Sequence, residues 1–296
     1  MHLPDGFLST PVWASLDVAA IPAVGYAVRR AQASLDESRV PLLGVMGAFV
    51  FAAQMINFPL GIGTSGHLVG SALLAFTLGP AAAAVVMSAI LAIQALVFQD
   101  GGILALGSNI VNMAMLGVLA GYLPFQLWGS GSWRRFAIFS AGVLSVLSSA
   151  VMAISELLIS GVRLPGPVLV VSLGLFFVAA VLEGAITLAV VEALESIRPG
   201  FLRQPPPGRS LALGLVSLAA VVMAAAGTLL ASTNPDGIER LAAQIGISAR
   251  QKVLEAPLMD YHSAWLSRAG AGIAGLVIIY AACMLLGRIM ARNRSV

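Results

Sequence analysis

Charged side chains are scarce in this sequence: Asp, Glu, Lys and Arg make up 10% of 296 residues, against about 25% in ordinary globular domains. The single cysteine, Cys283, excludes a disulfide framework and any metal cluster built on several cysteines. The single lysine, Lys252, does not lie in a Walker-type phosphate loop, so this chain does not hydrolyse ATP through that motif. An intramembrane metalloprotease pattern such as His-Glu-x-x-His is also missing.

Apolar residues dominate instead, with a hydrophobic fraction of 59% and a mean hydropathy of +0.95. The stretch from Val40 to Gln99 contains no Asp, Glu, Lys or Arg. A spanning helix needs about 20 apolar residues, and we predict an all-α polytopic membrane protein. A soluble enzyme, a disordered chain and a nucleic-acid-binding protein are excluded. The predicted spans are nine, near 11–28, 41–58, 64–79, 81–99, 103–123, 136–160, 168–191, 210–231 and 269–287.

The basic residues are unevenly divided between the two sets of loops that nine alternating spans define. One set carries 11 of the 16 basic residues and the other carries 5. Cytoplasmic loops are enriched in Lys and Arg, so we expect the N-terminus outside and the C-terminus in the cytoplasm. The set of 11 consists of Arg29, Arg30, Arg39, Arg134, Arg135, Arg198, Arg203, Arg209, Arg288, Arg292 and Arg294.

A proline-rich stretch divides the chain into two units. Residues 200–209 contain three consecutive prolines flanked by glycine, a composition typical of an extended linker. Residues 1–199 then form a seven-helix membrane domain, and residues 210–296 form a second segment with two transmembrane helices. These two helices flank an exported stretch, 232–268, in which Asn234 is expected to cap a helix that ends at Gly246.

Two of the three histidines, His2 and His67, are predicted to lie on the same outer face of the membrane. A histidine at position 2 can chelate a metal through its ring and backbone nitrogens together with the Met1 amine. A ring nitrogen from His67 would complete an all-nitrogen set, which favours Ni(II) or Cu(II), although imidazole also suits Co and Zn. The alternative is that His67 is a polar residue that hydrogen-bonds between helices.

The N-terminal residues resemble the signature of the CbiM/NikM family of cobalt and nickel uptake proteins. The resemblance covers most of residues 1–199, and Asn234 to Glu239 is similar to the PDGLE signature of the small companion subunit, with Ile238 in place of Leu. The chain therefore looks like a fusion of the two subunits. The matching blocks are Met1-His-Leu-Pro-Asp-Gly-Phe-Leu-Ser9, Phe51-Ala-Ala-Gln-Met-Ile-Asn-Phe-Pro59, Gly63-Thr-Ser-Gly-His-Leu-Val-Gly70, Phe98-Gln-Asp-Gly-Gly-Ile103, Gly107-Ser-Asn109 and Asn112-Met113.

Members of that family are the substrate-capture components of energy-coupling factor transporters. The resemblance implies that Met1, His2 and His67 bind Ni(II) or Co(II) as transported substrate, with no ATP or organic cofactor bound by this chain. It implies a transmembrane coupling subunit and cytoplasmic ATPase subunits as partners. The expected location, surrounded by lipid, is the cytoplasmic membrane of a bacterium or archaeon.

Other polar residues in the matching blocks are candidates for supporting the metal ligands or for metal access: Asn57, Ser65, Asp100, Asn109 and Asn112. Interhelical hydrogen bonds unrelated to a metal are the alternative for the asparagines. The carboxylates Asp17, Glu156 and Glu183 fall inside predicted spans, where such groups are usually functional, although snorkelling toward the membrane surface is an alternative. His262, in the exported stretch, either collects metal or is a solvated loop residue.

Two other functions are compatible with the sequence. The first is a self-sufficient secondary carrier or channel in which Asn57, His67 and Asp100 line a conduction path. The second is a membrane-embedded enzyme that uses Glu156 or Glu183 as acid or base. No convincing paired spacing supports this enzyme, so we expect no catalytic activity from this chain.

Overall fold

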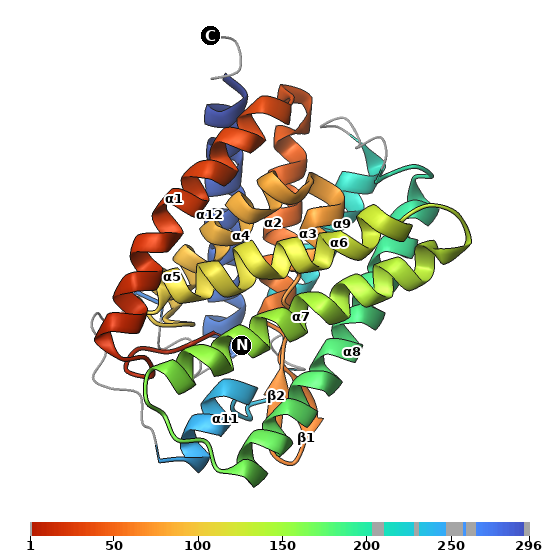
Figure 1. Cartoon of the computed structure of the whole chain (residues 1–296). Helices are drawn as coiled ribbons and strands as arrows, with labels where there is room; N and C mark the ends of the chain where they lie inside the picture. The colour runs from red at the N-terminus through yellow and green to blue at the C-terminus, as the bar shows by residue number, and fades with distance from the viewer. Residues whose placement is uncertain (1, 203–209, 228–230, 247–256, 259–264, 293–296) are drawn as a thin grey trace.

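The computed structural model describes residues 2–202, 210–227, 231–246, 257–258 and 265–292. The chain is an all-α polytopic membrane protein, as predicted, with a single small β-hairpin among the described residues (Figure 1). Six of its helices are long and apolar enough to cross a membrane: Thr10–Ser34 (α1), Pro80–Phe98 (α4 and a π-helical turn from Gln94), Leu106–Trp128 (α5, a π-helical stretch Ile110–Gly117, and α6), Gly131–Ile159 (α7 from Arg134), Gly166–Ile197 (α8) and Ala269–Arg292 within α12.

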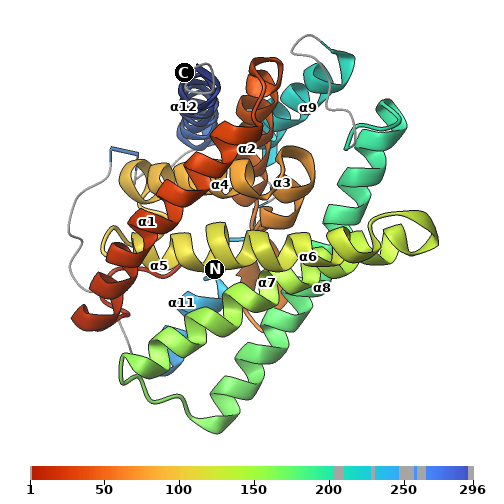
Figure 2. The ribbon, with the colours of Figure 1, turned by 45° about the horizontal axis from the view of Figure 1, so that its top comes forward.

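The helices before the proline-rich stretch form a bundle in which α7 packs along both α6 and α8, and α1 packs along α4 and α5. Apolar residues at positions three and four apart place one face of each helix against its neighbours, and the opposite face stays exposed. Exposed apolar side chains such as Ile21 on α1 and Phe177 on α8 belong to a surface that suits lipid rather than water. Figure 2 shows α1, α6, α7 and α8 around the outside of α3 and α4.

The predicted span 64–79 is wrong. Its first residues form a β-hairpin, Phe58–Gly61 (β1) with Thr64–Gly66 (β2), and only Ser71–Leu78 (α3) is helical. Eight residues of helix extend about 12 Å, far less than the roughly 30 Å of a hydrocarbon core. Gly70, with φ of 78°, adopts a left-handed conformation directly before α3, which explains why the helix starts there and no earlier.

The predicted span 41–58 corresponds to α2, Val40–Gln54, which is also shorter than expected. The predicted span 210–231 corresponds to α9, Leu211–Val222, followed by a π-helical turn that ends at Gly227. The described residues therefore contain six helices long enough to cross a membrane and these two shorter apolar helices. The sequence had predicted nine spans. Sequence runs overestimate helix length here because loop residues between the helices are apolar as well.

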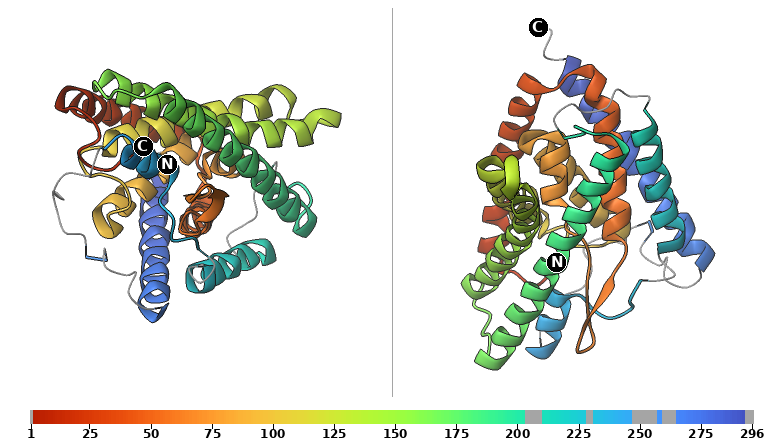
Figure 3. Two further views of the ribbon diagram at one scale, coloured as in Figure 1. Left: turned by 90° about the horizontal axis from the view of Figure 1, so that it is seen from below. Right: turned by 90° about the vertical axis from the view of Figure 1, so that its right-hand side faces the viewer.

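The helices after the proline-rich stretch join the first bundle through α2. Both α9 and α12, Trp265–Arg292, pack against α2, on the opposite side from α7 and α8 (Figure 3). A Cβ atom at Gly47 of α2 would lie only 2.8 Å from Sγ of Cys283 on α12, so glycine permits this close approach. The three prolines of the linker lie outside the described residues.

The segment between α9 and α12 contains a short helix, Gly237–Gln244 (α11), that lies beside the hairpin and α8. Its N-cap is Asp236, so the prediction that Asn234 caps it is wrong. The Asp236 carboxylate accepts hydrogen bonds from the backbone N–H of Ile238 and of Glu239, and the Glu239 side chain accepts from the Asp236 N–H. The predicted end at Gly246 is confirmed, since this residue follows the C-cap with φ of 72°.

Candidate metal centre

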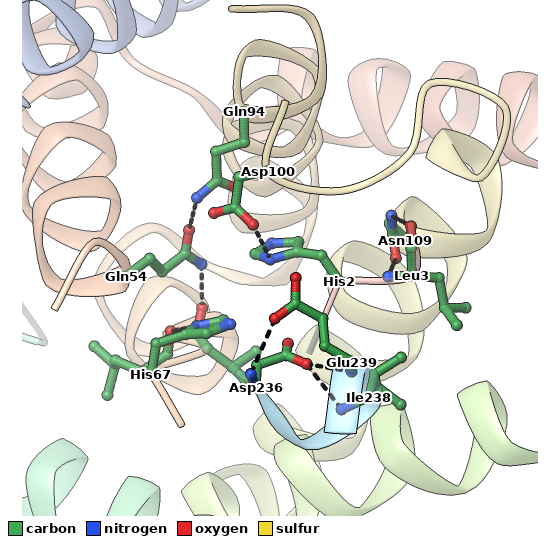
Figure 4. Close-up of polar contacts among 12 residues, drawn as sticks. His2, Leu3, Gln54, His67, Gln94, Asp100, Asn109, Asp236, Ile238 and Glu239 are labelled. Atoms are coloured by element: carbon green, nitrogen blue, oxygen red, sulfur yellow. Dashed lines mark hydrogen bonds and ion pairs between the residues drawn. The ribbon is translucent and has the colours of Figure 1, made fainter. Parts of the chain in front are cut away.

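The first residues of the chain are inserted between helices by paired hydrogen bonds. The Leu3 N–H donates to Asn109 Oδ1 over 2.8 Å, and Asn109 Nδ2 donates back to the Leu3 carbonyl over 3.2 Å. The same carbonyl accepts from the Gly102 N–H over 2.8 Å. The Leu3 side chain is completely buried. These contacts fix the backbone on the C-terminal side of His2 in one position (Figure 4).

The loop after α4 is shaped to receive this segment. The Leu104 N–H donates to Asp5 Oδ1 over 2.8 Å, which ties the loop to the N-terminal residues. A Cβ atom at Gly102 would lie 2.5 Å from the Asp5 backbone nitrogen, so any larger residue at this position would displace the segment. Gly101, with φ of 93°, supplies the turn that brings Gly102 alongside the N-terminal segment.

His2 and His67 face each other at the end of this segment. Their ring planes are nearly parallel, at 8°, with centroids 5.1 Å apart. His2 is 4% exposed and His67 is 9% exposed, so both rings are withdrawn from solvent. Within the described part of the chain, Nε2 of His2 is buried without a hydrogen-bond partner. A buried nitrogen without a partner is costly, and it is available to bind a ligand.

His67 presents its ring from the irregular segment 67–70 that follows β2. Its Nδ1 lies 2.9 Å from the Leu68 carbonyl, which can only accept, so Nδ1 carries the proton and Nε2 carries the lone pair. Burial lowers the pKa of His67 to about 3, and the positive charges of the chain's N-terminus and of His2 add to this effect. The ring is therefore neutral at physiological pH, which is the form that binds metal ions.

Asp100 lies beside His2, with its Oδ1 3.1 Å from Nδ1 of that ring. Burial alone would raise the pKa of the Asp100 carboxyl, but the charge and hydrogen bond of His2 lower it below its usual range. The side chain is 45% exposed, and the exposed part borders a cavity. A carboxylate on a ring nitrogen orients the imidazole and stabilises its positive form.

The cavity has a volume of about 490 Å³. It lies between the first bundle and the segment after α9, because both contribute to its wall. Burial raises the pKa of Glu239, and the neighbouring Asp236 carboxylate raises it further. The polar side chains of the wall belong to Gln54, Asn57, His67, Gln94, Gln99, Asp100, Ser232, Thr233, Asn234, Asp236 and Glu239.

The carboxylates inside the predicted spans hold the loops of this centre, and they do not snorkel. The two oxygens of Glu183, a side chain that is 1% exposed, accept from the N–H of Val69 and of Gly70, each over 2.8 Å. Glu183 thereby positions the segment that carries His67. The sequence showed a carboxylate in a span, but its partners more than 100 positions away left no local signal.

Glu156 and Asp17 have equivalent roles on the other side of the N-terminal segment. Glu156 accepts a short hydrogen bond from Ser108 and another from Asn112 Nδ2 over 3.1 Å. Asp17 accepts from the Gly107 N–H over 2.6 Å. Both carboxylates are thus bound to the helix that carries Asn109, the residue that holds Leu3.

The remaining predicted residues connect the two parts of the chain. Ser65 donates through Oγ to the Asn234 carbonyl over 2.7 Å and through its N–H to the Pro235 carbonyl over 2.9 Å. The Asn57 carbonyl accepts from the Ser232 N–H over 2.7 Å. These contacts place the segment 232–239 over the cavity. None of these hydrogen bonds involves a histidine ring.

Met1 and His262 lie outside the described residues. Within the described ranges, no three side chains of His, Cys, Asp or Glu converge closely enough to hold a metal ion by themselves. A site built on His2 and His67 must therefore recruit backbone or terminal nitrogen atoms. The donor set expected from the sequence, which includes the Met1 amine and the His2 backbone nitrogen, stays a prediction.

A bundle of apolar helices with two buried imidazole rings facing each other at one end defines the class: a polytopic membrane protein with a candidate site for a transition-metal ion. Residues 2–201 match the CbiM family, described as the cobalt uptake substrate-specific transmembrane region. The chain belongs to this family, which comprises nickel and cobalt transport proteins and not enzymes. The enzyme alternative is accordingly not supported, and Glu156 and Glu183 have the structural partners described above.

The similarity extends beyond the family region. The chain is 35% identical over 293 residues to a protein of Archaeoglobus fulgidus assigned as a fused nickel transport protein, NikMN. The alignment covers 95% of this chain and 96% of that protein. It is 30% identical over 270 residues to LarMN of Lactiplantibacillus plantarum, assigned as a fused nickel transport protein, covering 84% and 82%. A solved transition metal transporter is 30% identical, with a TM-score of 0.50, over 67% of this chain and 93% of the other.

Proposed function

We propose that this chain is the substrate-capture subunit of an energy-coupling factor importer and that it takes up Ni(II) or Co(II) from outside the cell. The observation that carries the proposal is the pair of buried rings, His2 and His67, 5.1 Å apart, with an unpartnered nitrogen on His2. Imidazole nitrogen is a preferred donor for these metals. The hydrogen bonds around Leu3 supply the rigid support that such a site requires.

The proposed ligands are the Met1 amine, the backbone and ring nitrogens of His2, and Nε2 of His67. This chelate requires that Met1 be the first residue of the working protein. Four nitrogen donors in a plane favour Ni(II) over Co(II), which more often takes additional ligands. Cu(II) would bind more tightly than either on strength alone, so its exclusion depends on availability and geometry.

The proposed orientation places the cavity outside. Figure 1 shows α11, the hairpin and the α7–α8 connection at one end of the bundle, and the α1–α2 connection and the end of α12 at the other. Arg29, Arg30 and Arg39 belong to the second end, together with Arg288 and Arg292. The positive-inside rule assigns that end to the cytoplasm, where ATPase subunits would act through a transmembrane coupling subunit.

The proposed domain division follows the same contacts: 1–199 captures the metal, 200–209 links, and 210–296 assists loading. The hydrogen bonds of Ser65 with Asn234 and Pro235 support an assisting role, since they hold the second unit against the cavity. Deletion of residues 201–296 should reduce metal uptake by cells that also produce the partner subunits. Unchanged uptake would contradict the assisting role.

The experiment that tests capture is a calorimetric titration of the detergent-purified chain with Ni(II) and with Co(II). His67→Ala should lower the affinity by about a hundredfold or more, because it removes a ligand from a chelate of four. His262→Ala, which removes the third histidine of the chain, serves as the control and should leave the affinity unchanged. Equal affinities for the two variants would overturn the proposed ligand set.

One observation favours a self-sufficient carrier or channel: Asn57, His67 and Asp100 border the same cavity. Such a carrier would transport metal in liposomes without partner subunits, driven by an ion gradient. The capture subunit should bind metal in the same liposomes but transport none until the coupling and ATPase subunits are added together with ATP.

A further inference from the structure

The carboxylate of Asp236 holds the start of α11 with only one of its two oxygens. Oδ1 accepts from the N–H of Ile238 and from the N–H of Glu239, each over 2.8 Å. Oδ2 takes no part in either hydrogen bond. This division leaves Oδ2 to serve a second donor, and Asp236 lines the cavity together with His67.

We propose that Asp236 is a positioning residue for the N-terminal amine of the chain. Its Oδ2 accepts a hydrogen bond from the amine and holds it near His67, where the amine can bind the metal. This inference rests on the proposed function, in which the amine is a ligand, and deepens it. One side chain of the second unit then sets the place of a ligand that belongs to the first unit.

The chain itself ties the amine to this region. The amine precedes His2 by one residue, so it lies within about 5 Å of the His2 Cα atom. The His2 ring lies against that of His67, with centroids 5.1 Å apart, and a Cβ atom at Gly101 would lie 3.2 Å from the His2 Cβ atom. The Leu3 N–H, on the other side of His2, is held by Asn109. The amine therefore has only a small region to occupy, beside the two rings.

The backbone of Asp236 brings its carboxylate to the same region. Asp236 forms a parallel bridge with Ser65, two residues before His67. Ser65 also donates through Oγ to the Asn234 carbonyl over 2.7 Å, which fixes the approach of this segment. Figure 4 shows the Asp236 side chain beside His67 and below the ring of His2. The amine and the carboxylate thus reach one place from opposite ends of the chain.

The electrostatics of the cavity distinguish Asp236 from its acidic neighbours. Burial alone would raise the pKa of the Asp236 carboxyl, but the charge of the N-terminal amine and a hydrogen bond from that amine lower it. On the pKa of Asp100 and of Glu239 the amine acts through its charge, without a hydrogen bond. Asp236 is therefore the carboxylate that can direct the amine, and the other two contribute to the field around it.

A carboxylate in contact with the amine suits a metal ligand. A primary amine that binds a metal through its lone pair keeps two N–H groups, and the metal makes both of them stronger donors. Carboxylates that accept from a metal ligand fix its orientation, and their loss typically costs about 10–100-fold in metal affinity. Oδ2 of Asp236 can accept one of the two N–H groups and so aim the lone pair.

The contact can be trapped covalently in the metal-free full chain in detergent. A water-soluble carbodiimide activates a carboxylate, and a neighbouring amine attacks the activated carbonyl to form an amide while the carbodiimide leaves as a urea. Only two amines are present in the chain, the N-terminal amine and that of Lys252, so few products arise. Mass spectrometry of the digested chain should find the N-terminal peptide joined to the peptide that contains Asp236.

The positioning role is tested by Ni(II) titration of Asp236→Asn. This variant keeps the helix start, because Asn is as good an N-cap as Asp, but an N–H₂ group replaces the oxygen that accepts from the amine. Glu239→Gln is the matched control, since it removes one charge from the same cavity wall and Gln replaces Glu in a capping box. Affinity should fall about tenfold or more in Asp236→Asn and by no more than about twofold in Glu239→Gln.

A purely structural effect of Asp236→Asn is separated by placing Gly-Ser ahead of Met1, which removes the amine as a ligand. In the extended chain, Asp236→Asn should cause no further loss of the residual Ni(II) affinity, since both changes act on one contact. An equal loss with and without the extension would overturn the proposal. So would equal affinities of Asp236→Asn and Glu239→Gln, or a cross-link from the N-terminal peptide to Asp100 or Glu239 in place of Asp236.

The proposed function fails in a different way. If His67→Ala bound Ni(II) as tightly as the wild-type chain, the proposed ligand set would be wrong, yet the cross-link to Asp236, which forms without metal, would still appear. If the cross-link were absent while His67→Ala lost Ni(II) binding, the role of Asp236 would be refuted and the capture site would stand.

Discussion

Two walls face the same cavity, and their chemistry differs. The wall from residues 2–202 includes the His67 ring, which faces the ring of His2, and the Asp100 carboxylate, whereas the ionisable groups in the wall from residues 231–246 are the carboxyl groups of Asp236 and Glu239. Nitrogen donors select transition metals, whereas carboxylates attract any divalent cation. Under the proposed function, metal selection would depend on the nitrogen donors, which all belong to the first part of the chain.

The two walls also differ in how they are supported. Glu183, Glu156 and Asp17 hold the first wall through buried hydrogen bonds to loop backbone and side chains. The second wall is held by backbone and hydroxyl contacts from Ser65 and Asn57. Buried charge-assisted bonds are worth more than neutral ones, so changes in the first wall should have the larger effects.

The largest effect is expected from Glu183→Gln. The amide keeps one acceptor but turns an N–H₂ group toward a backbone N–H, so the segment that carries His67 loses one of its two anchors. We expect a loss of about 1.5–3 kcal/mol in the free energy of unfolding and roughly tenfold weaker Ni(II) binding. Thermal unfolding in detergent and calorimetry measure the two quantities.

Glu192→Gln is the matched control, because Glu192 lies on the same helix and pairs at the surface with Arg135. Exposed ion pairs contribute about 0–1 kcal/mol, so this variant should resemble the wild-type chain in both measurements. If Glu192→Gln reduced metal affinity as much as Glu183→Gln, the positioning role of Glu183 would be refuted.

A smaller effect is expected from Gly102→Ala, which tests the N-terminal segment alone. The added methyl group would lie 2.5 Å from the Asp5 nitrogen, so the segment that carries His2 must move. Overpacking costs about 1–3 kcal/mol, and metal affinity should fall severalfold. Gly174→Ala on α8, where nothing lies within 4 Å, should leave affinity unchanged. Wild-type affinity in Gly102→Ala would mean that the segment's position is irrelevant to binding.

The smallest effects are expected for two adjacent residues of β2, whose substitution should change the free energy of unfolding in different directions. Ser65→Ala removes the hydrogen bond to the Asn234 carbonyl and should cost about 0.5–1.5 kcal/mol of stability. Thr64→Val removes a buried hydroxyl that has no partner in the described structure, so stability should stay equal or rise. Thermal unfolding of both variants gives the comparison, and a loss in Thr64→Val as large as in Ser65→Ala would refute it.

Long apolar runs predicted the membrane class and located α7, α8 and α12 well, because nothing except a spanning helix requires so many consecutive apolar residues. The hairpin at residues 58–66 was missed. It contains no charged residue, so it continues the uncharged run of its neighbours, and Pro59, the three glycines and the Thr64-Ser65 pair are what distinguish it from a span. Asn234 and Asp236 are both good N-caps, and the structure selects Asp236 because Asn234 and Pro235 are engaged with Ser65.

The candidate centre was partly predictable. His2, His67 and Asp100 could be assigned to one membrane face from charge counting and motif resemblance, and the structure brings all three together. The anchoring role of Glu183 could not be derived, because it depends on contact with Gly70, 113 residues earlier in the chain. The approach of Glu239 to Asp100 likewise depends on how two separate parts of the chain pack.

The most direct test of the account is a Ni(II) titration of the chain with its native start against the same chain carrying Gly-Ser ahead of Met1. The extension keeps every side chain but converts the Met1 amine into an amide and adds bulk where the N-terminal segment enters the bundle. The account predicts that tight Ni(II) binding is lost in the extended chain. Unchanged Ni(II) affinity in the extended chain would contradict the N-terminal chelate.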